Sequence, residues 1–197
     1  MLKLRIFIAK LRHPFRVKKW KKQAPFMIGN YILNGVTLEN VRISNATVIT
    51  NESKMNIYKD VFIGHFNFLE SSNGITIEEG VQITNYISIL THSSHVSIRL
   101  YGENYAKHQG EMKGYINGSV KIGKFSFIGP HSTIQAGSEI GKGCLVASHS
   151  LVKGNFPDFS IIAGVPAKVI GDTRALDSNY LNQYPELQKY YDKWAKN

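Results

Sequence analysis

An aliphatic residue recurs at every sixth position in the second half of the chain. The six positions are Ile122, Ile128, Ile134, Ile140, Val146 and Val152. A helix repeats its apolar positions about every 3.6 residues and a half-buried strand every two, so this period fits neither. It predicts a chain that turns a corner every six residues, so that three short flat faces make one coil and the aliphatic side chains stack inward as ladders.

Small residues accompany five of the six ladder positions and support the same interpretation. Glycine or alanine follows the aliphatic residue directly at Gly123, Gly129, Gly141 and Ala147, and a small residue lies four places after it at Ser126, Ser132, Ser138, Cys144 and Ser150. Small side chains let the corners close. One such coil cannot bury its own ladder, so neighbouring coils must stack. We therefore expect an all-β solenoid.

The same spacing appears earlier in the chain and is then interrupted. Ile63, Leu69 and Ile75 follow at intervals of six, and after a slip of two residues the interval resumes at Ile77, Ile83 and Ile89. Residues 95–119 carry no hexad, whereas the repeat returns at Val120. A long irregular segment inside a repeat array is usually functional. We expect an excursion from one corner of the solenoid.

The ends of the chain differ from the repeats and suggest three parts. Residues 1–25 form a basic amphipathic segment, 26–170 the solenoid with its excursion at 95–119, and 171–197 a linker followed by a short helix. We expect Leu187, Tyr190, Tyr191 and Trp194 of that helix to buttress the solenoid. The single cysteine, Cys144, cannot form an internal disulfide, which indicates a packed thiol in a reducing, cytoplasmic compartment.

The net charge of +10 comes from the N-terminus, because residues 1–22 hold nine Lys or Arg and no acid. The longest uncharged run there is far shorter than the ~20 residues of a membrane span. Two interpretations stay open: the segment lies on the inner surface of an anionic membrane, or it packs on the solenoid with a solvated charged face. Nucleic-acid binding is not expected, since no recognised module follows.

Three segments in this order resemble a known family: FIGPHSTI (127–134), AGSEIGKG (136–143) and IIAGVPAKVIG (161–171). They resemble the closing coils of hexapeptide-repeat acyltransferases, and in particular the acetyl-CoA-dependent O-acetyltransferases of sugars and polysaccharides. The resemblance implies a left-handed parallel β-helix, acetyl-CoA as co-substrate, no metal, and a homotrimer with active sites between subunits. It also implies a glycan hydroxyl as acceptor, in a surface polysaccharide, a lipopolysaccharide or a nucleotide- or lipid-linked precursor.

Acyl transfer to a hydroxyl needs a base that takes the hydroxyl proton, and histidine suits this task. In the family the base lies where a coil gives way to the long loop, and here His92 and His95 lie three and six residues after Ile89. We expect His95 to be the base and His92 to orient it, contact the acceptor or end the strand. The side chains of Glu103 and Glu111 and nearby backbone carbonyls are candidates to orient the base.

The resemblance also implies positions for both substrates. Ala147, Ser148, Ala163 and Gly164 match the family's groove for the pantetheine arm, and Lys153 and Lys168 match the phosphate end. Asn85 matches a position that touches the acceptor, and Arg99, Tyr101 and Tyr105 suit a sugar through stacking and hydrogen bonds. Phe127, which stands at the family's aromatic position, is a further substrate-binding candidate. The family's oxyanion donor is in doubt because Pro130 has no N–H and no hydroxyl, so Ser132 or a neighbouring backbone N–H is the substitute.

Two other enzymatic functions use the same scaffold. An N-acetyltransferase would act on an amino sugar or a xenobiotic, and only an acceptor screen separates it from an O-acetyltransferase. A zinc lyase resembling γ-carbonic anhydrase would need three histidines on one metal. In that case His65 or His131 would have to join His92 and His95, whose spacing differs from that of the zinc group.

Overall fold

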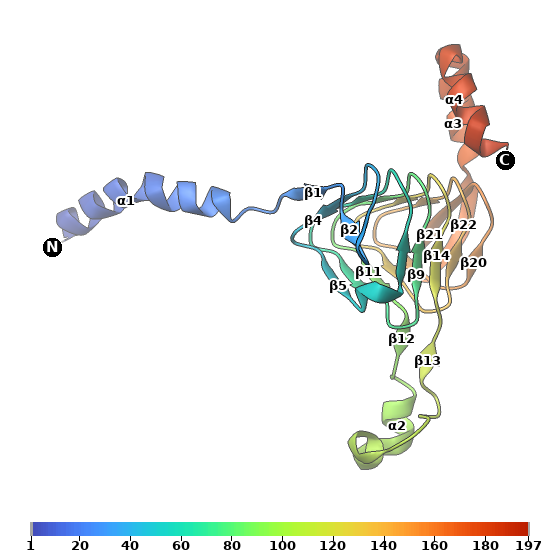
Figure 1. Ribbon diagram of the computed structural model, residues 1–197, viewed down its shortest axis with the longest axis horizontal. Helices are drawn as coiled ribbons and strands as arrows, with labels where there is room; N and C mark the ends of the chain where they lie inside the picture. The colour runs from blue at the N-terminus through green and yellow to red at the C-terminus, as the bar shows by residue number, and fades with distance from the viewer. Residues whose placement is uncertain (1, 197) are drawn as a thin grey trace.

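The computed structural model describes residues 2–196 of the chain, and their side chains from residue 8 onward. Three sheets of short strands surround one apolar core, and a helix, a hairpin and a helical pair extend from them (Figure 1). Successive strands pair in parallel from coil to coil. The molecule is thus largely β, and its parallel sheets fit the left-handed β-helix expected from the sequence.

Each sheet forms one face of the stack. The first sheet contains β1 (Met27–Gly29), β4 (Arg42–Ser44), β7 (Phe62–Ile63), β10 (Gln82–Ile83), β15 (Phe127–Ile128), β18 (Leu145–Val146), β21 (Ser160–Gly164) and β22 (Ala167–Asp172). The second contains β5 (Val48–Thr50), β8 (Phe68–Glu70), β11 (Ser88–Leu90), β16 (Thr133–Ile134) and β19 (Leu151–Val152). The third contains β6 (Met55–Ile57), β9 (Ile75–Ile77), β14 (Val120–Ile122), β17 (Glu139–Ile140) and β20 (Asn155–Phe156).

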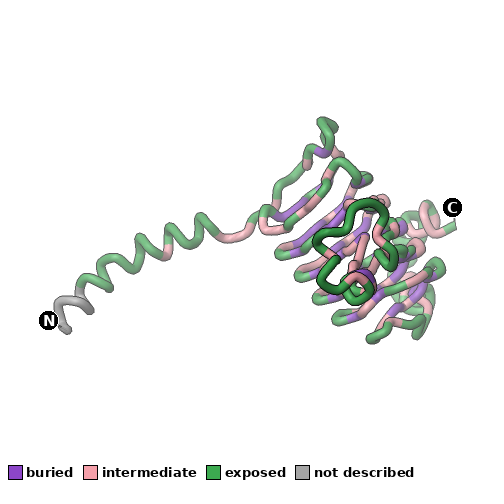
Figure 2. The backbone as a smooth tube through the Cα atoms, turned by 90° about the horizontal axis from the view of Figure 1, so that it is seen from below, coloured by how far each residue is buried: buried purple, intermediate pink, exposed green. Residues whose placement is uncertain are grey.

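The expected ladders form the core. All six positions from Ile122 to Val152 have no exposed surface, and the earlier set from Ile63 to Ile89 is equally buried. Figure 2 shows the buried positions alternating with exposed ones along the stacked coils. The slip of two residues between Ile75 and Ile77 is accommodated inside β9, where both side chains point inward.

The small residues of the hexad have two separate roles. A Cβ on Gly141 would lie 2.5 Å from the backbone nitrogen of Asp158, so the next coil leaves no room for a side chain. The buried hydroxyl of Ser126 donates to the carbonyl of Gly141 at 2.8 Å, which satisfies a polar group that would otherwise be costly to bury. Cys144 is buried, as expected for a packed core thiol.

The two ends of the chain are helical. At the N-terminus α1 (Leu2–Lys22) extends away from the coils in Figure 1, and the short strands β2 (Ile32–Leu33) and β3 (Val36–Thr37) follow. Ile8, Leu11 and Phe15 of α1 are exposed, whereas the apolar side chains at residues 2–7 lie outside the described side chains. Within the described residues, no helix has the length and apolar content needed to cross a bilayer.

Two helices stand where the sequence predicts a linker and one short helix. The first, α3 (Thr173–Gln183), begins after Asp172, whose carboxylate accepts from the backbone N–H of Arg174. After the 3-10 turn η3 (Pro185–Leu187), α4 (Gln188–Ala195) carries Trp194. The Trp194 ring lies 4.8 Å from Phe125 and 5.8 Å from Phe159, measured between ring centroids, so α4 does pack against the coils.

The excursion leaves the coils earlier than the sequence indicates. It starts after Thr91 and ends at Gly118, whose N–H donates to the Thr91 carbonyl at 3.0 Å. Its base is an antiparallel pair of β12 (His92–Ser93) and β13 (Ile116–Asn117), and its tip contains α2 (Ser97–Tyr101) and the 3-10 helix η2 (Gly102–Lys107). Both histidines therefore belong to the excursion.

Candidate active site

His92 is held by an acidic residue of the preceding coil. Its Nδ1 atom lies 2.7 Å from Oε2 of Glu70 and 3.1 Å from the hydroxyl of Ser72. The two residues meet because β8 and β11 pair in parallel, with Glu70 opposite Leu90, and His92 follows two residues later. The side chain of His92 is 35% exposed and that of Glu70 is 9% exposed, so a buried carboxylate supports a histidine that reaches solvent.

Glu70 is kept ionised by its hydrogen bonds. Burial by itself raises the pKa of this carboxyl, but hydrogen bonds from the side chains and backbone of Ser72 and Thr91 outweigh burial and lower the pKa to about 2. Oε2 accepts from the Thr91 hydroxyl at 2.7 Å and from its N–H at 3.2 Å, and Oε1 accepts from the Ser72 N–H at 2.9 Å. An anion is therefore fixed beneath the imidazole.

This anion determines the tautomer of the neutral imidazole. An ionised carboxylate can only accept hydrogen bonds, so His92 Nδ1 must carry a proton and donate it toward Glu70. The lone pair is then on Nε2, which is the atom available to a substrate. One face of the ring is covered by Tyr115, with centroids 5.5 Å apart and an interplanar angle of 12°. His92 thus has the orientation, and in its neutral form the tautomer, that a general base needs.

His95 lacks an equivalent support. Its Nδ1 atom lies 2.7 Å from the hydroxyl of Ser93, which can donate or accept, so this contact does not select a tautomer. His95 is exposed, and its backbone carbonyl accepts a hydrogen bond from the guanidinium of Arg99. The geometry favours His92 over His95 as the base, the reverse of the order expected from sequence.

The two histidines line one small hollow of about 80 Å³ at the base of the excursion. Its other lining residues come from β11, the hairpin and two later coils: Leu90, Ser93, Ile116, Gln135, Ala136 and Lys153. Of the predicted phosphate-end cations, Lys153 is therefore next to the histidines. A cation at this point is suited to an anionic group of a substrate.

The other predicted donor-binding residues gather at a different corner of the coils. Val146 pairs with Ile162, which places Ala147 beside Ala163, and Ala163 pairs with Lys168. Ser148 and Gly164 follow directly. This corner joins the first and second sheets, whereas the histidines lie where the second sheet gives way to the third. Within one chain the two groups are separated by the width of the second sheet.

The predicted acceptor residues are partly engaged in the structure itself. Asn85 Oδ1 accepts from the backbone N–H of His65 at 2.7 Å, and the Tyr101 hydroxyl accepts from the N–H of Lys113 at 3.0 Å. Arg99 bonds to His95, as described above. Phe127 is exposed on the outer surface of the first sheet, between Gln82 and Leu145, away from the residues of the histidine hollow.

Ser132 does not fit the role of oxyanion donor. It is 1% exposed, its hydroxyl donates to the carbonyl of Ala147 at 3.0 Å, and the same oxygen accepts from the N–H of Ser150. The expectation that Ser132 is the donor is wrong, because its hydroxyl already bonds to backbone groups of the next coil. Its neighbour His131 stacks on His149, with centroids 4.9 Å apart and an angle of 3°, so His149 belongs to a corner stack rather than to the histidine hollow.

In the described part of the chain, no group of three or more His, Cys, Asp or Glu side chains is placed to hold a metal ion. The two histidines that could have joined His92 and His95 on a metal, His65 and His131, lie at a different corner, between the first and second sheets. His65 Nδ1 lies 2.6 Å from the hydroxyl of Ser44, and His131 stacks between Tyr86 and His149.

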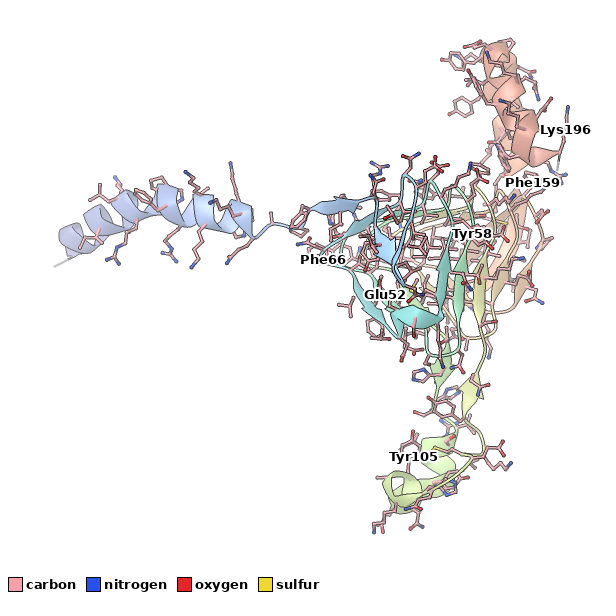
Figure 3. The ribbon with its side chains drawn as sticks, viewed as in Figure 1. Glu52, Tyr58, Phe66, Tyr105, Phe159 and Lys196 are labelled. Atoms are coloured by element: carbon pink, nitrogen blue, oxygen red, sulfur yellow. The ribbon has the colours of Figure 1, made fainter. Side chains whose placement is uncertain are left out.

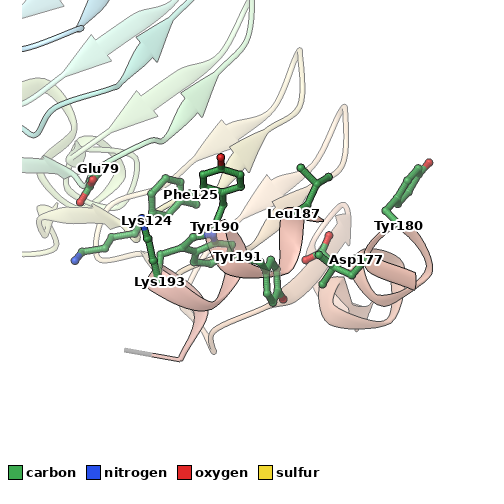
Figure 4. A pocket seen from close by; sticks show the side chains of 11 residues that line it. Glu79, Lys124, Phe125, Asp177, Tyr180, Leu187, Tyr190, Tyr191 and Lys193 are labelled. Atoms are coloured by element: carbon green, nitrogen blue, oxygen red, sulfur yellow. The ribbon is translucent and has the colours of Figure 1, made fainter. Parts of the chain in front are cut away.

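A larger cavity of about 670 Å³ lies elsewhere, between the C-terminal helices and the coils (Figure 4). Phe125, Leu187 and Tyr190 contribute to its walls, together with Asp177 and Lys124. It contains none of the residues predicted to take part in catalysis. The small histidine hollow, with its oriented imidazole, is therefore the better candidate site.

Glu70 is a candidate site residue that was not predicted from the sequence. The carboxylates that the sequence offers for orienting the base, Glu103 and Glu111, both lie within the excursion. The ladder spacing contained the needed signal, because Leu69 and Ile89 are 20 residues apart and so mark one full coil. An acid directly after Leu69 must lie under the residue directly after Ile89, and hence close to His92.

Comparison with known proteins supports the repeat and the fold. A family model described as "Bacterial transferase hexapeptide (six repeats)" matches residues 119–154. A serine acetyltransferase of Buchnera aphidicola subsp. Acyrthosiphon pisum is 31% identical over 151 residues, which are 76% of this chain and 46% of the relative. A putative lipopolysaccharide biosynthesis O-acetyl transferase, WbbJ of Escherichia coli K12, is 38% identical over 60 residues, or 30% of this chain and 31% of the relative.

Among solved structures, a variant of AntD, an N-acyltransferase from Bacillus cereus in complex with dTDP and coenzyme A, superposes with a TM-score of 0.50. The identity is 24%, and the match covers 73% of this chain and 89% of that one. The resemblance to hexapeptide-repeat acyltransferases is thus confirmed for the repeat and the fold. The chain spans less than half the length of the two curated relatives above.

Proposed function

We propose that this chain is an acetyl-CoA-dependent O-acetyltransferase whose acceptor is a hydroxyl of a sugar in a cell-surface polysaccharide, a lipopolysaccharide or one of their precursors. The observation that carries this proposal is the pair of His92 and Glu70, in which the carboxylate fixes the tautomer of the neutral imidazole and leaves the Nε2 lone pair for a substrate, in a side chain that lines a hollow. The similarity to WbbJ supports a sugar acceptor, and the curated relatives support acetyl transfer.

In the proposed reaction His92 Nε2 takes the proton of the acceptor hydroxyl as that oxygen attacks the thioester carbonyl. The positive charge that then forms on the imidazole is stabilised by Glu70 at 2.7 Å. When the C–S bond breaks, the same proton passes from Nε2 to the departing sulfur, which leaves as a thiol. The imidazole returns to its starting state, so no other proton source is required.

We further propose that the site is completed by a second copy of the chain within a homotrimer of left-handed β-helices. The support is the separation described above: Lys153 lies with His92, whereas Ala147, Ser148, Ala163, Gly164 and Lys168 lie at another corner. Packing that corner of one copy against the excursion of its neighbour would place both groups in one cleft. A monomer in solution that retains full activity would contradict this part of the proposal.

The function is tested by incubating the protein and acetyl-CoA with a panel of glycans and reading the products by mass spectrometry. A gain of one acetyl group that is then released by mild base would identify an ester, because an acetyl amide withstands mild base. The panel includes amino sugars, so that N-acetylation is detected if it occurs. Acetylation by the wild type but not by His92→Ala is expected, and absence of acetylation on every acceptor would reject the proposal.

We propose that the chain has the three parts expected from its sequence. The first part, which contains α1, would then have a function of its own. We propose that α1 lies on the anionic inner surface of a membrane, where a lipid-linked acceptor would be made. Ile8, Leu11 and Phe15 are exposed and fall on one side of the helix, and Lys or Arg residues flank them. Phe15→Asp should reduce flotation with phosphatidylglycerol vesicles, whereas flotation with neutral vesicles should be weak for both proteins.

A further inference from the structure

A second hollow lies within the excursion, beside the candidate base. Its volume is about 310 Å³, at the lower end of the ~300–1,000 Å³ of typical ligand pockets. It is lined by Tyr105, Glu111, Met112, Tyr115 and Asn117. Figure 3 labels Tyr105 within the excursion, far from Tyr58 on the coils. None of these five residues lines the histidine hollow that contains Lys153.

The strand register connects this hollow to His92. In the antiparallel hairpin His92 pairs with Asn117, so the two side chains lie side by side on one face of the ribbon. Tyr115, two residues before Asn117, projects from the same face and stacks on the imidazole. Ser93 and Ile116 point to the other face and line the histidine hollow. His92 therefore stands between two separate hollows.

The backbone beside Glu111 and Met112, two lining residues of the excursion hollow, is held in place by three side chains. The buried hydroxyl of Ser97 donates to the carbonyl of Lys113 at 2.9 Å, and the Tyr101 hydroxyl accepts from the N–H of Lys113. The ring nitrogen Nε2 of His108 bonds to the carbonyl of Glu111 at 3.1 Å. Backbone fixed by such contacts needs little reordering when a ligand binds.

The return strand also packs tightly on α2. A Cβ on Gly114, where φ is +75°, would lie 2.8 Å from Cγ1 of Val96 and 3.1 Å from Cδ1 of Leu100. The excursion is therefore a small packed unit rather than an open loop. It presents its hollow as a preformed surface.

The chemistry of the lining suits a sugar ring. Phenol rings and a thioether offer apolar faces to the C–H groups of a pyranose, while two phenol hydroxyls, an amide and a carboxylate offer hydrogen-bond partners for its hydroxyls. Tyr115 is 38% exposed, so it has surface left to contact a ligand as well as His92. No lysine or arginine lines this hollow, whereas Lys153 lines the other one, so the two hollows differ in charge.

We infer that the excursion hollow is the acceptor subsite and binds one pyranose ring, with Tyr115 and Asn117 as the walls next to His92. Tyr115 is in addition a positioning residue, because its ring fixes the plane of the imidazole. This inference rests on the proposed function and deepens it. The ring bound here presents a hydroxyl to Nε2 of His92, while the acetyl donor approaches through the hollow that contains Lys153.

The test is direct binding of a panel of methyl glycosides, measured by saturation-transfer NMR on wild type, Tyr115→Phe, Tyr115→Ala, Asn117→Ala and the control Tyr58→Ala. Tyr58 is exposed on the coils. The glycoside that binds wild type and Tyr58→Ala should bind Tyr115→Ala about tenfold more weakly, as expected for loss of a stacking wall. Asn117→Ala should also weaken binding, and Tyr115→Phe, which keeps the ring, should bind almost as well as wild type.

Steady-state kinetics on the same variants separates binding from positioning. Tyr115→Ala should raise KM for the acceptor and lower kcat, Asn117→Ala should raise only the acceptor KM, and KM for acetyl-CoA should be unchanged in both. Equal glycoside binding by wild type, Tyr115→Ala and Asn117→Ala, or no glycoside binding by wild type, would overturn the subsite. Binding that depends on Tyr115 without any acetyl transfer would instead overturn the proposed function and leave the subsite standing.

Discussion

Nδ1 of His92 lies 2.7 Å from Oε2 of Glu70, although 22 residues separate them in sequence. The contact exists because stacking brings each coil over the one before it. It gives a neutral imidazole one defined tautomer, and it places a negative charge where protonation of that imidazole would be stabilised. The following predictions start from this pair and from the stacking that creates it.

Replacing Glu70 by Gln should disable the base while nearly preserving its shape. The amide can donate its N–H to His92 Nδ1, which would move the ring proton to Nε2 and remove the lone pair that the substrate needs. We expect kcat to fall by about 10²- to 10⁴-fold, the range for losing a positioned base or its tautomer. Release of the CoA thiol measures this rate. Glu139→Gln, at an exposed carboxylate paired with Lys121, serves as the control and should keep full activity.

The two histidines should respond unequally to alanine substitution. His92→Ala removes the oriented imidazole and should abolish nearly all turnover, with acetyl-CoA binding unchanged by calorimetry. His95→Ala removes an exposed side chain from the wall of the hollow and should lower kcat by less than about tenfold. The reverse result, with His95→Ala inactive and His92→Ala active, would restore the assignment that the sequence favours.

Acid should destabilise the protein partly through Glu70. The pKa of this carboxyl is lowered from 4.5 to about 2 in the folded protein, so the contribution is present above pH 4.5 and is lost as the pH falls toward 2. At about 1.4 kcal/mol per pKa unit, it amounts to roughly 3 kcal/mol. Urea unfolding should show that the stability difference between wild type and Glu70→Gln shrinks across this pH window. A difference that is constant from pH 5 to pH 2 would exclude the contribution.

Coil stacking should not tolerate a methyl group at Gly141. The added Cβ would lie 2.5 Å from backbone nitrogen and side-chain oxygen of Asp158, so adjacent coils would have to separate. We expect the free energy of unfolding to fall by about 1–3 kcal/mol, as for other overpacked sites. Gly29→Ala is the matched control, because a Cβ there meets no atom within 4 Å and should change the denaturation midpoint little.

The hexad predicted the fold well because each ladder position reports the same local fact, an inward side chain on a three-sided coil. The excursion bounds were less accurate, since Thr91 to Ser94 continue the hydrophilic pattern of a corner and give no signal that the chain has left the coils. The sequence predicts a linker ahead of the C-terminal helix, yet this segment forms α3, a helix capped by Asp172.

The candidate site was predicted only in part. The position of His92 and His95 at the end of a coil follows from the last ladder residue, Ile89, and Lys153 was found near them. Glu70 needed the coil length as well as the ladder. Tyr115 was out of reach, because its contact with His92 depends on the register of the hairpin, which two short strands without a turn motif do not reveal.

The excursion hairpin is inserted where β11 and β14 are already paired with strands of both adjacent coils. Those pairings do not depend on what lies between Thr91 and Gly118. The excursion can therefore be replaced by another sequence without loss of the strand pairing that holds the coils together. Chimeras that graft excursions of other sequences onto these coils would be expected to change which molecules are modified while the handling of the thioester stays the same.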